Sequence, residues 1–272
     1  MSRLKDWAGQ RAFAKFTNRE IKRNPRHRPR PRAGAVPLKT AGRCCQKGKG
    51  TVGENQGGKV ANRAAAYIDG FNLYHPIREM SEPFLKWCNL WRLSELLCAP
   101  HDLALQKVVL CTAMQMHRAD TIGRHRTFNN AQIASGVQVI EGHYIFNEEL
   151  GRHSEKQSDI NVALSLIMDG IDDIYDWAFL VSADSDQAAT ARVFKERFKE
   201  KRLVVVAPPN RSPPDKANAY ADLTFTISKD QIERSLLPQL VPSLGGGFIR
   251  RPKEYDPPDW WMPPDKRPKR NR

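Results

Sequence analysis

The stretch Ala64-Ala65-Ala66-Tyr67-Ile68-Asp69-Gly70-Phe71-Asn72 sets the pattern for the rest of the chain. Its apolar run, residues 64–68, ends at Asp69-Gly70, a pair that favours a turn. A continuous apolar run of this length is typical of a strand that is buried on both faces. The polar side chains that follow, Asp69 and Asn72, would then lie at the carboxyl end of that strand.

Apolar runs of the same kind recur downstream, separated by helical patterns. Strands are expected at residues 107–112, 137–140, 177–182, 203–207 and 223–227. Helices are expected at residues 90–98, 119–135, 158–168 and 186–200, and a last one ends near residue 237. Because strands alternate with helices and are continuously apolar, the sequence predicts an α/β fold with a parallel sheet covered on both faces.

The helix expected from Ser158 follows a loop, and the Ser158 side chain would cap it. Four apolar residues of this helix recur at the spacing of a core-facing stripe, Ile160, Ala163, Leu164 and Ile167. The helix is therefore predicted to pack through these four side chains.

The basic charge of the chain is concentrated at its two ends. The 272 residues carry 44 Lys and Arg against 30 Asp and Glu, a net charge of +14. Residues 1–63 hold 17 basic and 3 acidic side chains, residues 64–249 hold 19 and 23, and residues 250–272 hold 8 and 4. The middle of the chain is mildly acidic, so the net charge is no evidence for a basic domain.

These differences divide the chain into three parts: a disordered basic arm (1–63), a folded domain (64–240) and a Pro/Trp/Arg-rich tail (241–272). The arm has too few apolar residues to offset the entropy of ordering it. It could hold nucleic-acid backbone nonspecifically. A solvated tail, a true start at Val60 and an organelle transit peptide are the alternatives. The C-terminal tail is expected either to lie across the domain or to stay free.

Several classes of protein are disfavoured by what the sequence lacks. The apolar runs are too short to cross a bilayer and no signal peptide is evident, so we expect a cytoplasmic protein without a membrane partner. Five scattered cysteines lack zinc-site spacing and suit a reducing compartment. No G-x-G-x-x-G follows the first strand, and P-loop and G-x-S-x-G motifs are absent, which counts against dinucleotide, P-loop and serine-hydrolase chemistry.

Carboxylates follow several of the expected strands. Ligands bind beyond the carboxyl ends of the strands in an open parallel sheet, where Asp69, Asp184 and Asp186 would lie. Asp159, at the start of a helix, can point the same way. Each Asp alone suits a turn or a helix cap. Crowded carboxylates, however, raise one another's pKa unless a cation neutralises them, and all-oxygen sites favour Mg²⁺ or Mn²⁺. Such an ion can activate water for attack on a phosphodiester.

Three motifs carry a resemblance to a known family. Residues 67–74 (Tyr-Ile-Asp-Gly-Phe-Asn-Leu-Tyr) resemble the opening motif of the NYN domain family, a branch of the PIN-like nucleases that includes the LabA-like proteins. Residues 155–159 (Glu-Lys-Gln-Ser-Asp), before an apolar helix, resemble its second acidic motif, and residues 181–186 (Val-Ser-Ala-Asp-Ser-Asp) resemble its third. The motifs occur in the family's order and cover about residues 64–227.

The resemblance implies a Rossmann-like three-layer α/β/α sandwich with a mainly parallel central sheet, as in PIN-like proteins, and a divalent-metal ribonuclease site. On that basis Mg²⁺ or Mn²⁺ would be held by the carboxylates of Asp69, Asp159, Asp184 and Asp186. Asn72 would orient water, substrate phosphate or the Asp69 carboxylate by hydrogen bonding.

The sequence departs from the family's pattern in two motifs. The third motif usually has Gly where Ala183 stands, and an aromatic or aliphatic residue where Gln187 stands. The second commonly has Gly-Val where this chain has Gln157-Ser158. Every carboxylate is kept, so these departures bear on loop geometry and on the level of activity.

Three basic residues near the motifs are weaker candidates for contacts with substrate phosphate, Lys156, Arg118 and Arg124. Each also suits a solvated position on the surface. The acidic run in residues 169–176 is predicted to be a solvated turn, with weak cation binding as the alternative.

The leading hypothesis is an enzyme, a metal-dependent ribonuclease that hydrolyses RNA phosphodiester bonds. The alternative is a non-catalytic RNA-binding or regulatory protein that retains the NYN fold. A third reading, an aspartyl-phosphate phosphatase or nucleotide-sugar transferase, rests on Asp184-x-Asp186 alone. RNA is the expected partner, and a homodimer is kept as an option.

Overall fold

The computed structural model describes residues 62–113, 119–147 and 152–268, of which residues 119, 120, 143–147 and 152–156 are described by their backbone alone. All described residues belong to one compact unit, Gly57–Arg272. Arg118 and nearly all of the predicted N-terminal arm lie outside the described residues.

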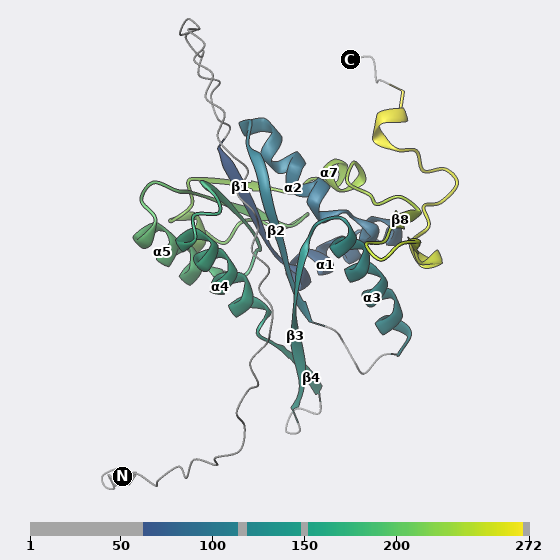
Figure 1. Cartoon of the computed structure of the whole chain (residues 1–272), viewed down its shortest axis with the longest axis horizontal. Coiled ribbons are helices and arrows are strands. Elements are labelled where there is room, and N and C mark those ends of the chain that lie inside the picture. The colour runs from purple at the N-terminus through teal and green to yellow at the C-terminus, as the bar shows by residue number, and fades with distance from the viewer. Residues whose placement is uncertain (1–61, 114–118, 148–151, 269–272) are drawn as a thin grey trace, which may run out of the picture. The chain divides into compact units, whose positions relative to one another are not determined.

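A central sheet of seven strands organises the domain (Figure 1). The strands are β1 (Arg63–Asp69), β2 (Ala104–Ala113), β3 (Gln138–Asn147), β4 (Arg152–Lys156), β5 (Trp177–Val181), β6 (Arg202–Ala207) and β7 (Leu223–Thr226). Their order across the sheet is β4-β3-β2-β1-β5-β6-β7, and all neighbouring pairs are parallel except β3–β4. The sheet is therefore mainly parallel, as predicted.

Helices cover both faces of this sheet. One face carries α1 (Gly70–Glu79), α2 (Leu90–Cys98), α3 (Ala119–Ala134) and α7 (Lys229–Glu233). The other carries α4 (Ser158–Ile171), α5 (Ala188–Arg197) and α6 (Asp215–Asn218). The fold is a Rossmann-like three-layer α/β/α sandwich, which confirms the predicted fold class.

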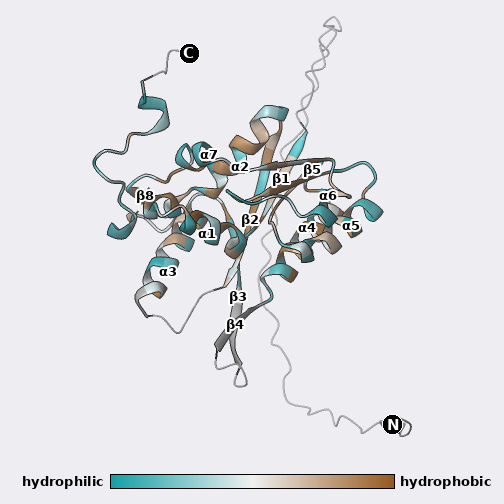
Figure 2. Ribbon diagram, turned by 180° about the vertical axis from the view of Figure 1, so that it is seen from behind, coloured by the Kyte–Doolittle hydropathy of each residue, from teal (hydrophilic) through white to brown (hydrophobic). Residues whose placement is uncertain are grey.

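The alternation of side chains along β1 builds two separate cores. Ala64, Ala66 and Ile68 pack in the core under α1 and α2, whereas Ala65 and Tyr67 pack in the core under α4 and α5. All five side chains are at most 1% exposed. Figure 2 shows the central strands as mainly hydrophobic, which is why the apolar runs could be recognised as strands buried on both faces.

Two elements beside the predicted motifs differ from the expectation. A helix, α1, begins at Gly70 directly after β1, where only a turn was expected. The segment before Ser158, expected as a loop, contains β4, which pairs antiparallel with β3. The five residues of β4, Arg-His-Ser-Glu-Lys, are all polar, so the apolar runs that revealed the other strands could not reveal this one.

The buried face of α4 is not the predicted one. Val162 and Leu166 are 0% exposed, whereas the predicted core residues Ile160 and Leu164 are 60% and 57% exposed. Gly170 continues the buried face, because a Cβ there would lie 2.7 Å from the ring of Phe198. The helix carries two apolar stripes, and the periodicity alone could not decide which one faces the sheet. Ala163 and Ile167 lie half-buried between the two stripes.

The C-terminal segment lies across the domain. It forms a hairpin of β8 (Leu240–Pro242) and β9 (Phe248–Arg250), and then packs aromatic rings on the 3₁₀ turn Pro83–Trp87. Trp261 lies 5.3 Å from Phe84 between ring centroids, and Arg267 forms an ion pair with Glu233. Of the two expected alternatives for the tail, the packed one is observed.

The described cysteines are buried, unpaired thiols, Cys88, Cys98 and Cys111. Burial raises the pKa of the Cys88 thiol to about 12. Within the described residues, no helix combines the length and apolar character that a membrane span requires.

The order of the strands reverses beside β1. The chain moves outward from β1 through β2 to β3, returns along α4, and adds β5 on the other side of β1. The carboxyl ends of β1 and β5 therefore meet where the strand order reverses, which is where open α/β sheets bind ligands.

Candidate active site at the carboxyl edge of the sheet

Asp69 is the last residue of β1 and the N-cap of α1. Asp69 as a residue is 3% exposed, and its carboxylate accepts hydrogen bonds from the backbone N–H of Asn72 (3.0 Å) and from the Ser182 hydroxyl (3.4 Å). Gly70 permits the immediate turn into α1, because a Cβ there would lie 2.8 Å from the carbonyl oxygen of Cys111 on β2. The position of Asp69 is thus set by both the helix cap and the sheet.

Asn72 connects the ends of β1 and β5. Its side-chain oxygen accepts a hydrogen bond of 2.8 Å from the backbone N–H of Ala183, and its own backbone N–H binds Asp69. The amide side chain therefore positions the loop after β5. Asn72 was predicted to orient the Asp69 carboxylate, and it does so through its backbone N–H.

The loop after β5 is organised by Asp184. Its carboxylate caps the 3₁₀ turn Ser185–Gln187 by accepting from the backbone N–H of Asp186 (2.8 Å). The hydroxyl of Ser182 accepts from the backbone N–H of Asp184 (3.1 Å). The side chain of Asp186 is exposed and caps no helix. The helix-cap role that the sequence suggested for single aspartates is therefore filled by Asp184.

Asp159 brings a fourth carboxylate to this edge from the first turn of α4. The side chain of Gln187 donates a 3.2 Å hydrogen bond to the backbone carbonyl of Asp159. Burial raises the pKa of the Asp159 carboxyl, and the charges of Asp184 and Asp186 raise it further, while a hydrogen bond with Asp69 acts the other way. The other three predicted carboxylates thus lie close enough to Asp159 to affect its pKa.

Gln157 is the N-cap of α4, and no side chain caps this helix, so the prediction that Ser158 caps it is wrong. Gln157 also has an unfavourable backbone conformation. Its φ and ψ are +82° and −11°, in the left-handed region that favours Gly. It stands where the family pattern has Gly. Ala183, the other Gly replacement, is not among the described residues with positive φ. One departure from the pattern therefore strains the backbone beside the site, and the other does not.

The carboxylates have the oxygen donors that a hard cation prefers, but their positions in this structure do not surround one. All are oxygen donors, which Mg²⁺ and Mn²⁺ prefer. No Lys or Arg among the described side chains forms an ion pair with Asp159, Asp184 or Asp186. In the same set of side chains, however, no group of three or more His, Cys, Asp or Glu is placed to hold a metal ion as it stands.

The predicted phosphate contacts do not gather at this site. Arg124 on α3 forms a 3.1 Å ion pair with Glu254 and lines a cavity under α1. Lys156 ends β4, but its side chain is outside the described part of the chain, as is all of Arg118.

The acidic run at the opposite, amino edge of the sheet is a solvated turn only in part, because Asp172 and Asp173 are exposed whereas Asp169 is buried. Asp169 is 8% exposed, accepts a 2.7 Å hydrogen bond from the hydroxyl of Tyr67, and pairs with Lys107 at 2.8 Å. Asp173 and Asp176 both pair with Arg63, at 3.0 and 2.7 Å. The basic partners come from distant parts of the sequence, so the local charge pattern could not reveal them.

Sequence reasoning missed two supporting residues, Ser182 and Gln187. Ser182 bridges Asp69 and the backbone of Asp184, and Gln187 ties the turn after β5 to α4. Both stand inside or beside the third motif, so their position in that motif was an available signal for a role at the site.

The comparisons with known proteins add little to this picture. No family model matches the chain, and no curated protein matches it either. The resemblance to the NYN domain family thus stays a prediction. One solved structure, a protein of unknown function from Vibrio parahaemolyticus, is similar with a TM-score of 0.48 and 19% sequence identity, over 66% of this chain and 99% of that one. This chain therefore shares a weak structural likeness with a protein whose title states no activity.

Proposed function

We propose that the chain is a metal-dependent ribonuclease that hydrolyses RNA phosphodiester bonds. The observation that carries the proposal is the meeting of Asp69, Asp159, Asp184 and Asp186 from three separate elements, β1, α4 and the turn after β5. They meet at the reversal of strand order, where this architecture binds ligands.

The electrostatics support a cation at this edge. Burial raises the pKa of Asp159, and repulsion by Asp184 and Asp186 adds to the shift at a cost in stability. An ion pair with Lys or Arg would remove it, but the described residues provide none for Asp159, Asp184 or Asp186. A bound Mg²⁺ or Mn²⁺ would remove the repulsion, activate a water molecule and stabilise charge on the phosphodiester.

The protein's own residues would keep the carboxylates in place. Asp69 is held by the Asn72 backbone and by Ser182, so it enters the site with little freedom. Asn72 fixes the loop that carries Asp184. We assign Asp69 and Asp159 as the first pair of ligands, with Asp184 and Asp186 completing the set.

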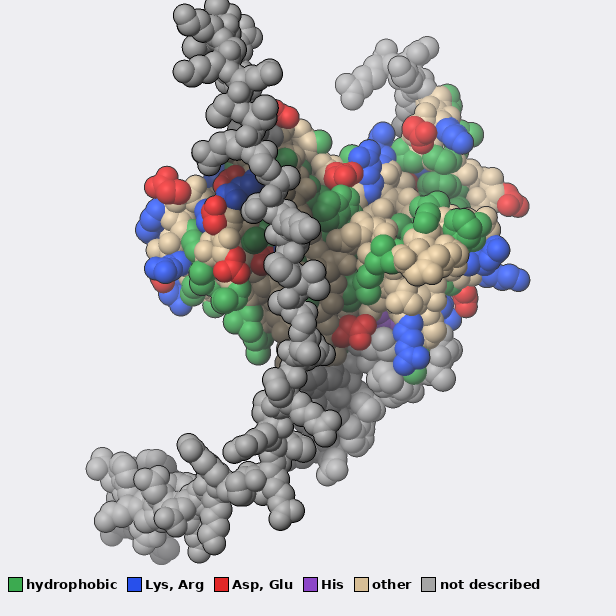
Figure 3. All heavy atoms as spheres, in the orientation of Figure 1, with side chains coloured by type: hydrophobic (Ala, Val, Ile, Leu, Met, Phe, Trp, Pro, Cys, Tyr) green, Lys and Arg blue, Asp and Glu red, His purple; other side chains and the backbone are tan. Residues whose placement is uncertain are grey.

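RNA as the substrate requires positive charge close to an acidic site. Figure 3 shows acidic and basic side chains interspersed over one face of the domain rather than gathered in a basic patch. The strongest basic segment of the sequence is residues 1–63, which would supply nonspecific contacts with the RNA backbone. We therefore expect binding of RNA to weaken steeply with salt, because counterions are released from the phosphates.

The test is cleavage of end-labelled single-stranded RNA by the purified full chain in Mg²⁺ or Mn²⁺. Asp184→Asn should lower the rate by about 100-fold or more, since it removes a ligand charge. Asp173→Asn is the matched control, because it removes an Asp from the amino edge and should leave the rate unchanged. Cleavage that persists in EDTA, or equal loss in both variants, would rule out the proposal.

A non-catalytic RNA-binding protein is the second candidate. Two observations favour it: the carboxylates are not placed to hold a metal as they stand, and Gln157 strains the second motif. RNA binding without turnover, under any divalent ion, would select this function. Release of phosphate from small phosphomonoesters would instead select the phosphatase reading.

A further inference from the structure

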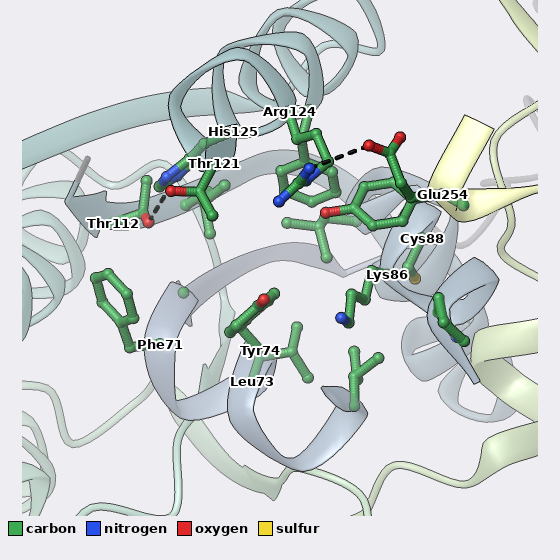
Figure 4. A pocket seen from close by; sticks show the side chains of 17 residues that line it. Phe71, Leu73, Tyr74, Lys86, Cys88, Thr112, Thr121, Arg124, His125 and Glu254 are labelled. Carbon is green, nitrogen blue, oxygen red and sulfur yellow. Dashed lines mark hydrogen bonds and ion pairs between the residues drawn. The ribbon is translucent and has the colours of Figure 1, made fainter. Parts of the chain in front are cut away.

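A cavity of about 370 Å³ lies between α1 and α3, on the face of the sheet opposite α4. This volume falls in the range of roughly 300–1,000 Å³ that is typical of small-molecule sites. Figure 4 shows Phe71 and Tyr74 from α1 on one wall and Arg124 and His125 from α3 on the opposite wall.

The cavity adjoins the carboxylate site. Its lining includes Gly70, the residue after Asp69, and Thr112 at the end of β2. Asp69 is paired in register with Cys111, the residue before Thr112. A ligand in the cavity would therefore lie on one side of the first turn of α1, and the carboxylates on the other.

The walls are mainly aromatic and aliphatic. Phe71, Tyr74, Phe128 and Tyr255 contribute rings, and the apolar part of the lining exceeds the polar part. A few polar groups interrupt it, among them Thr112, whose hydroxyl lies 3.4 Å from Nε2 of His125. An apolar cavity with a few convergent polar groups is the usual form of a site for an organic ligand.

Lys86 supplies the charge. Its ammonium lies 5.6 Å from the ring centroid of Tyr74 and 5.9 Å from that of Tyr255. In the part of the chain that is described, it forms no hydrogen bond or ion pair. Burial and the nearby charges of Arg78 and Arg124 lower its pKa. Arg124, in the same lining, is by contrast paired with Glu254.

A half-buried ammonium that lacks a carboxylate partner is costly unless a ligand brings the negative charge. Rings that flank it can stack on a planar heteroaromatic group, and such stacking is tolerant of base identity. The ligand that satisfies both features is an aromatic ring that carries an anionic group.

We propose that this cavity is a nucleotide-binding pocket, with the base among the aromatic rings and a phosphate near Lys86. One part of this inference rests on the proposed function. If the chain cleaves RNA, the pocket would bind the nucleotide next to the bond that is cut. Binding of a free nucleotide does not depend on catalysis.

The experiment measures binding of the four nucleoside 5′-monophosphates to the full chain by calorimetry, without divalent metal. Lys86→Met keeps the aliphatic stem and should weaken binding about tenfold or more, because it removes a charge-assisted contact. Tyr255→Ala should weaken it about fivefold or more through lost stacking. Lys253→Met is the control, because Lys253 is an exposed Lys in the same C-terminal turn as Tyr255. This variant should bind nucleotides as the wild type does.

Three outcomes would overturn the pocket: no nucleotide binding, equal affinity of Lys86→Met and Lys253→Met, or binding of inorganic phosphate as tight as that of nucleotides. Equal thermal unfolding of the variants excludes loss of folding as the cause. Unphosphorylated nucleosides should bind more weakly than nucleotides and lose the difference in Lys86→Met.

The two proposals fail in different ways. Nucleotide binding with no RNA cleavage would support the pocket and reject the nuclease. Metal-dependent cleavage with an unchanged KM in Lys86→Met would support the nuclease and reject the pocket as a binding site for its RNA substrate. Asp184→Asn should bind nucleotides normally while losing cleavage, because its side chain lies outside the cavity lining.

Discussion

The two edges of the sheet hold similar groups of aspartates in opposite electrostatic settings. At the amino edge, Asp169, Asp173 and Asp176 are neutralised by Lys107, Arg63 and Lys201. At the carboxyl edge, burial raises the pKa of Asp159, and the charges of Asp184 and Asp186 raise it further. Among the described residues no cation pairs with any of these three carboxylates.

The difference shows how acidic clusters can be sorted by their partners. Neutralised carboxylates tie strands and loops together, so removing one should cost stability and leave activity intact. Carboxylates without a neutralising cation store repulsion, so removing one should cost activity and leave stability intact or improved. Proteins accept such a cost mainly where function requires it.

The largest expected effect is on stability at the amino edge. Lys107→Met leaves the buried carboxylate of Asp169 with the hydroxyl of Tyr67 and without its cation. Loss of one partner from a buried pair costs about 3 kcal/mol. Chemical denaturation should report this loss, and the double variant Lys107→Met/Asp169→Asn should recover part of it. A Lys107→Met variant as stable as the wild type would refute the assigned structural role.

The second effect is on activity at the carboxyl edge. Asp159→Asn should reduce metal-dependent RNA cleavage about 100-fold or more, since it removes a proposed ligand charge. The same change relieves repulsion by Asp184 and Asp186, so the melting temperature should not fall. Parallel assays of cleavage and thermal unfolding test the expected loss of activity and the expected unchanged or raised melting temperature. Destabilisation together with full activity would place Asp159 among the structural aspartates.

A smaller effect is expected at the two departures from the family pattern. Gln157→Gly should stabilise the domain by about 1 kcal/mol, because Gly adopts a φ of +82° without strain. Ala183→Gly should destabilise it by about 0.5 kcal/mol, because Gly only adds freedom to the unfolded chain there. Urea unfolding distinguishes the two, and equal effects would show that backbone conformation is not the cause.

The smallest effect concerns pH at the amino edge. Hydrogen bonds from Lys201 and then Arg63 lower the pKa of the Asp173 carboxyl below its ordinary 3.8. A lowered pKa means that the stabilisation is present above 3.8 and is lost as the pH falls through the folded-state value. Asp173→Asn should therefore be slightly less stable than the wild type near neutral pH. The difference should vanish in acid, which unfolding curves across pH can follow; a difference that persists in acid would point to another cause.

Much of the fold could be predicted because it depends on local patterns. The helix Leu90–Cys98 was predicted to the residue, and β1 within one residue at each end. The site followed from a general rule: residues after parallel strands share one edge, so Asp69 and Asp184 had to lie near each other. The carboxyl-edge placement of Asp159 followed from the same rule, applied to the helix that feeds β5.

Other features could not be predicted because they depend on distant partners. The stripe of α4 that is buried was decided by Phe198 and Tyr175, which approach Gly170 closely. Arg63 and Asp176 lie 113 positions apart, and nothing local couples them. The cavity beside the site is closed by Tyr255 from the C-terminal segment, which was expected only as a tail.

The sequence by itself determined the α/β alternation, the parallel sheet and the edge at which the four aspartates were expected, because these follow from hydrophobic runs and from the common edge of residues that follow parallel strands. Only the tertiary structure decided which acidic groups are neutralised, which face of α4 is buried and where a cavity remains. Neutralisation, burial and cavity shape depend on side chains that meet across long stretches of chain. Their physical origin is packing and charge in three dimensions, which no local pattern records.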